Sequence, residues 1–138
     1  MTKLEIVNGI ATIPDGETKI ERFAFKDCTS IVDIIIPDSV TVIGHGAFYG
    51  CTSLKSVTIP MSVMKIADDA FCGCSSLKNI VIPESVIEIG EGAFKNCKSL
   101  ECITIAGGVK LAIHFYWRDV FEGCDSLKEI TFSQGIKR

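Results

Sequence analysis

Residues 53–60 read SLKSVTIP, and this stretch decides the fold because the chain returns to it several times. Leu54, Val57 and Ile59 are spaced by three and then two residues, and the β-branched end of the stretch predicts a short strand. Pro60 lacks the backbone N–H that a central ladder needs, so it marks the end of that strand. Counterparts of this stretch along the chain indicate a repeat protein.

The repeat has a period of 23 residues. An Ala-Phe pair recurs at this interval, at Ala24-Phe25, Ala47-Phe48, Ala70-Phe71 and Ala93-Phe94. Each pair is followed by a cysteine in the same column, namely Cys28, Cys51, Cys74 and Cys97. A fifth copy, with Phe121 and Cys124, begins 27 residues after its predecessor instead of 23, which is an insertion of four residues.

One repeat is too small to bury its own apolar side chains, whereas repeats stacked in register form a continuous core. Together with the L-x-x-L-x-L spacing, this predicts an α/β-type leucine-rich repeat solenoid with short parallel β-strands, coiled right-handedly as crossover connections generally are. Residue types that tolerate positive φ precede the repeat cysteines: Asp27, Gly50, Gly73, Asn96 and Gly123. We therefore expect a left-handed residue to end a short helical or 3-10 turn in each repeat.

The length of 138 residues fits a single domain, and the repeat divides it. We expect a degenerate N-terminal repeat or cap over 1–22, regular repeats over 23–106, an irregular insertion over 107–119, and the last repeat with the C-terminal end over 120–138. Terminal repeats are usually atypical because they cap an open stack.

The pattern L-x-x-I-x-I-P-x-S-V-x-x-I-G-x-x-A-F-x-x-C-x-S resembles the BspA-type leucine-rich repeat over residues 13–133. Ala106-Gly107-Gly108 departs from it by replacing the Pro-x-Ser turn. Members of that family are mostly surface or secreted proteins of bacteria and protists with adhesive roles. The resemblance implies an adhesin-like protein at the cell surface or secreted. The first residues, MTKLEIVNGI, contain no signal-peptide core, which leaves an intracellular location open.

Composition excludes several classes of partner. The net charge is −3, and the basic residues are scattered, so we expect no nucleic-acid partner. No apolar run approaches the roughly 18 residues of a membrane-spanning helix, so we expect no membrane insertion.

The sequence predicts no enzyme, no cofactor and no metal site. Five of the seven cysteines occupy one column beside the Phe column, where free Cys behaves as a small buried hydrophobe. Cys72 and Cys102 fall outside that column and are either reactive thiols or incidental residues. Asp68-Asp69 is a weak metal-site candidate, and turn conformation explains Asp69 better.

Two surfaces are candidates for binding a protein partner. The first is the outward face of the strands, which carries Lys55, Lys78, Thr58, Val81 and Thr104. The second is the insertion, where side chains enriched among interface hot spots follow one another as His114, Phe115, Tyr116, Trp117 and Arg118. The alternative for the insertion is that Phe115 or Trp117 folds back to fill space left by Ala112. Met61, Met64 and Ile87 form a further possible apolar patch.

The sequence therefore favours a non-enzymatic protein-binding module of the adhesin-like or surface-interaction kind. The alternative is a structural element that associates with itself, because a solenoid ends in strand edges that can pair with another copy.

Overall fold

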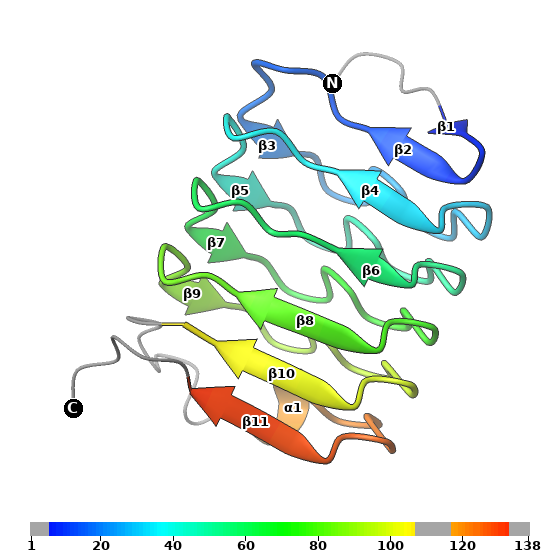
Figure 1. Ribbon diagram of the computed structural model, residues 1–138, viewed down its shortest axis with the longest axis vertical. Coiled ribbons are helices and arrows are strands. Elements are labelled where there is room, and N and C mark those ends of the chain that lie inside the picture. Colours follow the sequence, from blue (N-terminus) through cyan, green and yellow to red (C-terminus); the bar gives the residue numbers. More distant parts are fainter. Residues whose placement is uncertain (1–5, 107–116, 133–138) are drawn as a thin grey trace.

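The computed structural model describes residues 6–106 and 117–132, which form a solenoid of about five coils (Figure 1). Its strands lie in two rows on opposite sides of the coil. The row named here the front row contains β2 (Ile10–Thr12), β4 (Asp33–Ile35), β6 (Ser56–Val57), β8 (Asn79–Ile82), β10 (Cys102–Ile105) and β11 (Glu129–Phe132). The back row contains β3 (Lys19–Ile20), β5 (Val42–Ile43), β7 (Lys65–Ile66) and β9 (Glu88–Ile89).

Neighbouring coils are paired in the register that the repeat predicts. In the front row Asp33 pairs with Ser56, and in the back row Lys65 pairs with Glu88, each 23 residues later. Cys102 pairs with Glu129, 27 residues later, so the inserted residues do not shift the ladder of the last coil. All these pairs are parallel, and the predicted stacking of like residues on like is confirmed.

A third line of hydrogen bonds joins the coils at the turns that carry the Ala-Phe pairs. Within one such turn, Ala47 and Tyr49 donate their N–H groups to carbonyls three residues back, whereas Phe48 donates to Ala70 of the next coil, 2.8 Å away. The prediction of a short helical or 3-10 segment in each repeat is therefore not confirmed: residues 22–27, 45–50, 68–73 and 91–96 are runs of turns. A 3-10 helix needs consecutive local bonds, and here every second amide bonds to the neighbouring coil.

The described part of the chain contains one short helix, α1 (Trp117–Val120), which leads into the last coil. No helix among the described residues is long and apolar enough to cross a bilayer.

The predicted left-handed column is confirmed in all five coils. The φ angles are 57° at Asp27, 74° at Gly50, 78° at Gly73, 60° at Asn96 and 78° at Gly123. This conformation reverses the chain after the buried Phe, so that the next cysteine points inward.

The core is built from columns of identical side chains. The Phe48 ring stacks on Phe25 and on Phe71 with centroid separations of 5.2 Å on both sides. Phe94 continues the column below Phe71 at 5.3 Å. Leu, Ile and Val columns complete the interior, and among the described residues no polar or charged side chain is fully buried. The core therefore extends unbroken from coil to coil, as stacking requires.

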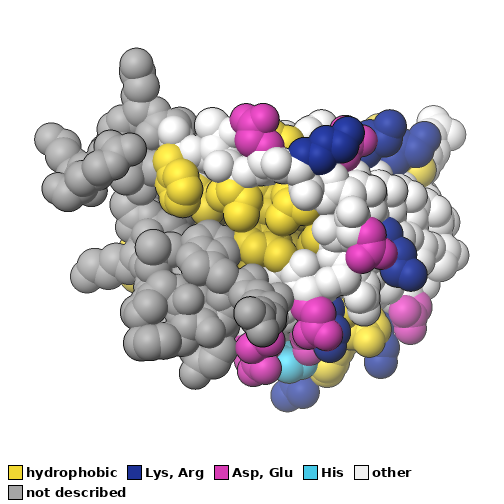
Figure 2. All heavy atoms as spheres, turned by 90° about the horizontal axis from the view of Figure 1, so that it is seen from below, with side chains coloured by type: hydrophobic (Ala, Val, Ile, Leu, Met, Phe, Trp, Pro, Cys, Tyr) yellow, Lys and Arg dark blue, Asp and Glu magenta, His cyan; other side chains and the backbone are white. Residues whose placement is uncertain are grey.

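The two ends of the front row differ. At the N-terminal end, β1 (Ile6–Val7) folds back antiparallel on β2 through the hairpin turn Asn8-Gly9, and Ala11 beneath it is buried. At the C-terminal end, apolar side chains gather in the middle of the face seen from below (Figure 2).

Candidate binding surfaces

The outward face of the front row presents the residues that the sequence nominated. Strand alternation buries Ile80 and Ile82 and leaves Val81 between them 56% exposed. Lys55, Lys78 and Thr58 are exposed, whereas Thr104 is half-buried. Side chains from three successive coils thus lie on one regular surface.

The ladder of the front row is interrupted once, between β6 and β8. One hydrogen-bonded sheet ends at β6, and the next begins at β8, although β7 and β9 remain paired on the back of the same coils. A groove of about 360 Å³ lies at this interruption. It is lined by Val57, Thr58, Ile59, Asn79, Ile80 and Val81. Two of the nominated residues, Thr58 and Val81, therefore face one groove.

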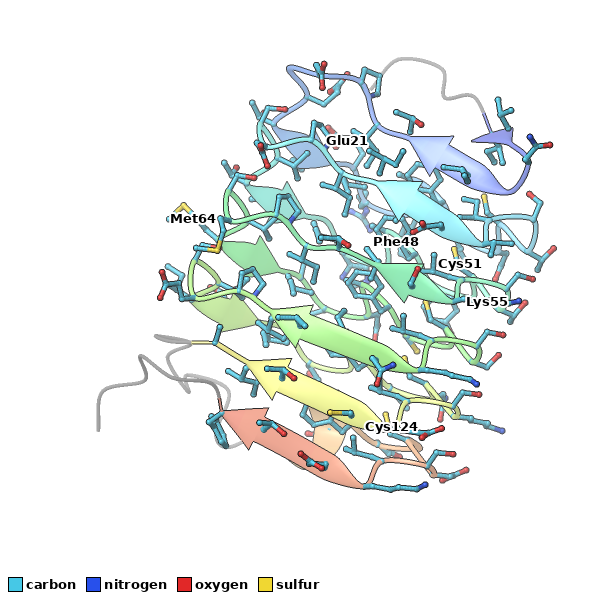
Figure 3. The ribbon with its side chains drawn as sticks, viewed as in Figure 1. Glu21, Phe48, Cys51, Lys55, Met64 and Cys124 are labelled. Atoms are coloured by element: carbon cyan, nitrogen blue, oxygen red, sulfur yellow. The ribbon has the colours of Figure 1, made fainter. Side chains whose placement is uncertain are left out.

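A second depression adjoins the same strands at their beginning. Lys55 and Lys78 line it together with Ser76 and Ser99. Two ammonium groups and two hydroxyls at one place favour an anionic group, such as a carboxylate. Figure 3 shows Lys55 at one end of the front-row strands and Met64 at the other.

Only the last residues of the insertion belong to the described structure. His114, Phe115 and Tyr116 lie outside the described residues. Trp117 and Arg118 begin α1, and their backbone is described but their side chains are not. The prediction that 114–118 forms a binding bulge stays a prediction.

The apolar patch predicted at the turns is exposed. Met61, Met64 and Ile87 are each about half exposed, and the N–H of Ile87 donates to the carbonyl of Met64 in the coil above. Met64 and Ile87 therefore lie side by side on neighbouring coils.

Sequence reasoning missed an aromatic and cationic cluster at the Ala-Phe turns. Phe23 is 38% exposed and has a φ of 56°, a conformation that is rare for a bulky residue. The Arg22 guanidinium and the Lys26 ammonium lie 5.2 and 5.3 Å from its ring centroid, and the His45 ring meets it edge-on at 5.1 Å. The sequence does mark this position, because Phe23 stands in the column where the later repeats have Gly46, Asp69 and Gly92.

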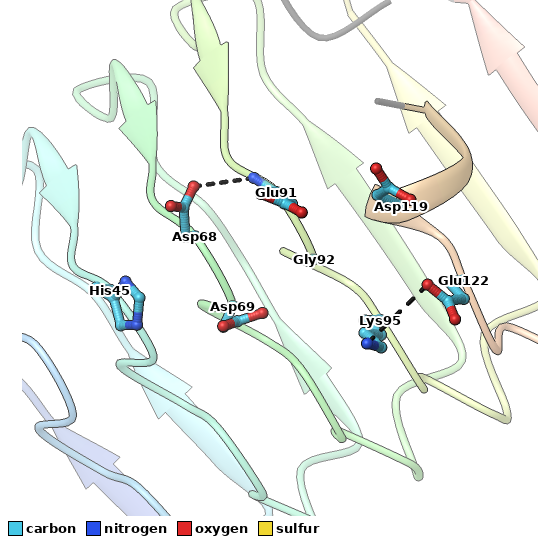
Figure 4. Close-up of a pocket in the computed structure, with 8 residues that line it drawn as sticks. All are labelled: His45, Asp68, Asp69, Glu91, Gly92, Lys95, Asp119 and Glu122. Atoms are coloured by element: carbon cyan, nitrogen blue, oxygen red, sulfur yellow. Dashed lines mark hydrogen bonds and ion pairs between the residues drawn. The ribbon is translucent and has the colours of Figure 1, made fainter. Parts of the chain in front are cut away.

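An acidic hollow of about 310 Å³ continues from this cluster along the same turns (Figure 4). It is lined by His45, Asp68, Asp69, Glu91, Gly92, Lys95, Asp119 and Glu122. The Asp68 carboxylate accepts a hydrogen bond of 2.9 Å from the N–H of Glu91. Asp69 has a φ of 56°, close to the 59° of Gly46 and the 69° of Gly92, so turn conformation does account for this residue.

No three metal-ligating side chains cluster within residues 6–106 and 117–132. Lys95 and Glu122 lie at an ion-pair distance of 4.0 Å across the acidic hollow. An exposed pair of this kind contributes little to stability.

The cysteine column is structural. Cys51, Cys74 and Cys97 are fully buried, and their thiols donate to the carbonyls of Phe25, Phe48 and Phe71 at 3.1, 3.2 and 3.1 Å. Burial raises the pKa of the Cys51 thiol to about 12. Cys72 is also buried, which raises its pKa, so it does not have the low pKa of a reactive thiol. Cys102 is half-buried on the front row.

Comparison with known proteins agrees with this architecture. The BspA type Leucine rich repeat region matches residues 8–114 in six copies. None of the curated protein sequences compared with this chain matches it.

Several crystal structures have the same fold. A leucine rich cell surface protein from Faecalibacterium prausnitzii A2-165 is 32% identical with a TM-score of 0.79, over 91% of this chain and 32% of that protein. A leucine-rich repeat protein from Bacteroides ovatus is 30% identical with a TM-score of 0.69, over 93% of this chain and 38% of that protein. The T. pallidum leucine rich repeat protein is 29% identical with a TM-score of 0.64, over 90% of this chain and 69% of that protein. This chain spans about a third of the first of these proteins.

Proposed function

Because the chain belongs to the BspA-type leucine-rich repeat family, we propose that it is a non-enzymatic module that binds a protein partner through the front row. Solenoids present extended regular surfaces, and such surfaces suit protein recognition better than chemistry on a small substrate. The family is typical of surface proteins, and one similar structure is that of a cell surface protein. We extend the proposal to an adhesin-like role at the cell surface.

The observation that carries this proposal is the groove between β6 and β8. The exposed side chain of Val81 and the side chain of Thr58 offer apolar contact there. β6 and β8 are not hydrogen-bonded to each other at this point, and the groove lies over their junction.

The lysines beside the groove set the chemistry of the partner. Lys55 and Lys78 precede β6 and β8, and Ser76 and Ser99 accompany them. An extended partner segment lying along the groove would place an acidic side chain between these two ammonium groups. The partner is therefore an extended protein segment that carries a carboxylate near one end.

The test compares single variants in binding to a partner first isolated on the wild-type chain. Val81→Lys should weaken binding at least about tenfold, which corresponds to about 1.4 kcal/mol, because it places a charge in the apolar groove. Lys78→Glu should weaken binding and reduce its dependence on salt. Met64→Lys is the matched control, since Met64 is 50% exposed against 56% for Val81 but lies at the far end of the coil.

Unchanged binding by Val81→Lys and Lys78→Glu would contradict the front row as the binding surface. Tyr116→Ala and Trp117→Ala test the insertion in the same assay. Loss of binding in these two variants alone would assign the function to residues 114–118 instead.

A further inference from the structure

The Ala-Phe turns form a surface, named here the turn face, that carries opposite charges in different coils. It runs along the side of the solenoid through the turns at residues 22–27, 45–50, 68–73 and 91–96. The first of these turns presents Arg22 and Lys26, which are both exposed. The third and fourth turns present Asp68, Asp69 and Glu91, which line the acidic hollow (Figure 4). The turn face therefore has a basic end and an acidic end.

The charges that define the two ends are not neutralised within the chain. Among the described residues, the ion pairs are Lys19 with Glu21, Lys65 with Glu88, Lys95 with Glu122 and Lys128 with Glu101. Arg22 and Lys26 belong to none of these pairs, and neither do Asp68 and Asp69. Both ends of the turn face thus keep charge that an opposite charge on another molecule can pair with.

Two aromatic rings lie beside the basic end and are held in place before any partner arrives. Phe23 and Tyr49 are each 38% exposed, and the Lys26 ammonium lies 5.3 and 5.7 Å from their ring centroids. The Phe23 ring lies against Gly46 of the next coil, where any side chain would collide with it. Aromatic and arginine side chains are enriched at interface hot spots, and a preorganised group loses less entropy on binding.

We propose that the turn face docks the turn face of a second copy of this chain, running in the opposite direction. The basic end of each copy then covers the acidic end of the other, whereas copies running in the same direction would place like charges together. A two-fold axis relates the two copies, so the assembly closes at a dimer. This proposal is independent of the partner-binding function, because it uses the side of the solenoid and not the front row.

The columns of the repeat make this face complementary to itself. Arg22 and Asp68 stand in one column, two repeats of 23 residues apart, and Phe23 and Asp69 stand in the next. Stacked parallel strands are about 4.8 Å apart, so each of these pairs is about 10 Å apart within one chain. A two-fold axis across the coils at the level of His45 keeps each column opposite itself and reverses the order of the coils. Arg22 then faces Asp68 of the second copy, and the Phe23 ring with its cations faces Asp69.

Reversing the charge of each end tests this proposal by sedimentation velocity. The basic-end variant carries Arg22→Glu and Lys26→Glu, and the acidic-end variant carries Asp68→Lys and Asp69→Lys. We expect the wild type to show a monomer–dimer equilibrium that weakens as NaCl is added, and each variant alone to dimerise at least about tenfold more weakly. An equimolar mixture of the two variants should form a dimer again, because each then presents the charge that the other lacks.

A front-row variant controls for the change in net charge. Lys55→Glu with Lys78→Glu alters net charge as the basic-end variant does, and it should dimerise like the wild type. Circular dichroism checks that every variant folds, and Asp69→Asn replaces Asp69→Lys if the lysine prevents folding, because Asn tolerates the φ of 56°. A wild type that stays monomeric at every concentration would overturn the proposal. A mixture of the two variants that stays monomeric, or loss of the dimer in the front-row variant, would also overturn it.

Discussion

The Cys51 thiol shows how one side chain can join two coils. It is fully buried, and it donates to the carbonyl of Phe25 at 3.1 Å, across the boundary between neighbouring coils. The same bond recurs from Cys124 to Phe94 at 3.0 Å, despite the insertion before the last coil. Buried polar atoms usually have such a partner, so the column links neighbouring coils as well as filling space.

Burial of this thiol makes stability depend on alkaline pH. The pKa of Cys51 is raised from 9.0 to about 12, so the unfolded chain loses this proton at lower pH than the folded chain does. The stabilising contribution is complete below pH 9 and is lost as pH rises towards 12. We expect the free energy of unfolding to fall by about 1 kcal/mol for this group between pH 9 and pH 10.

Urea unfolding at pH 8 and above measures this effect. Cys51→Ser keeps a donor to Phe25 but removes the titration, so its stability should fall less steeply with pH than that of the wild type. Cys51→Ala removes both and should share the shallower slope with lower stability at neutral pH. Equal slopes in all three proteins would show that this thiol does not couple folding to pH.

At the scale of the element, the turns were only partly predictable. Asp27, Gly50, Gly73, Asn96 and Gly123 identified the left-handed column, because few residue types tolerate positive φ. The hydrogen bonding of the same turns was not predictable, since every second amide bonds to a carbonyl of another coil. A local pattern indicates a helical turn there, and the neighbouring coil removes half of its bonds.

The strands and the first hairpin were also only partly predictable from the sequence. The strands follow from residues such as Val57 and Ile80, and Pro83 marks the end of β8 as expected. The hairpin of β1 and β2 was readable from Asn8-Gly9 but was not predicted. No residue in SLKSVTIP explains why the ladder stops at β6, so the groove could not be foreseen.

Substitution of Gly73 measures the free-energy cost of placing a side chain at a positive φ in the left-handed column. Its φ is 78°, and an added Cβ would lie 3.6 Å from Gly50, an ordinary van der Waals distance. Gly73→Ala should therefore destabilise the protein by about 1–2 kcal/mol through backbone strain alone. Gly73→Asn should cost less, because Asn96 occupies the same column at a φ of 60°. Thermal unfolding of both variants checks this order, and a neutral Gly73→Ala would contradict it.

At the scale of the whole molecule, each surface of the solenoid carries a different feature. The front row carries the groove, the turns carry an aromatic cluster and an acidic hollow, and the C-terminal end carries exposed core columns. Repetition predicts the inside of such a protein well, because the same side chain must recur in every coil. It predicts poorly the features that differ from coil to coil, such as the exposed ring of Phe23 and the missing ladder between β6 and β8.

All of these surfaces depend on coils that hold one another together through stacked columns. Phe71 lies between Phe48 and Phe94 and is fully buried, so Phe71→Ala should cost about 3–5 kcal/mol. Lys78→Ala on the exposed face should change the free energy of unfolding by less than about 0.5 kcal/mol.

The most direct test is a double-mutant cycle on this column. Phe48 and Phe71 stack at 5.2 Å, so the double alanine variant should differ from the sum of the single variants by about 0.5–3 kcal/mol. Phe25 and Phe94 are separated by the rings of Phe48 and Phe71, and their alanine variants should be additive. Additive effects at Phe48 and Phe71, or equal coupling in both pairs, would contradict a core built from coils stacked in register.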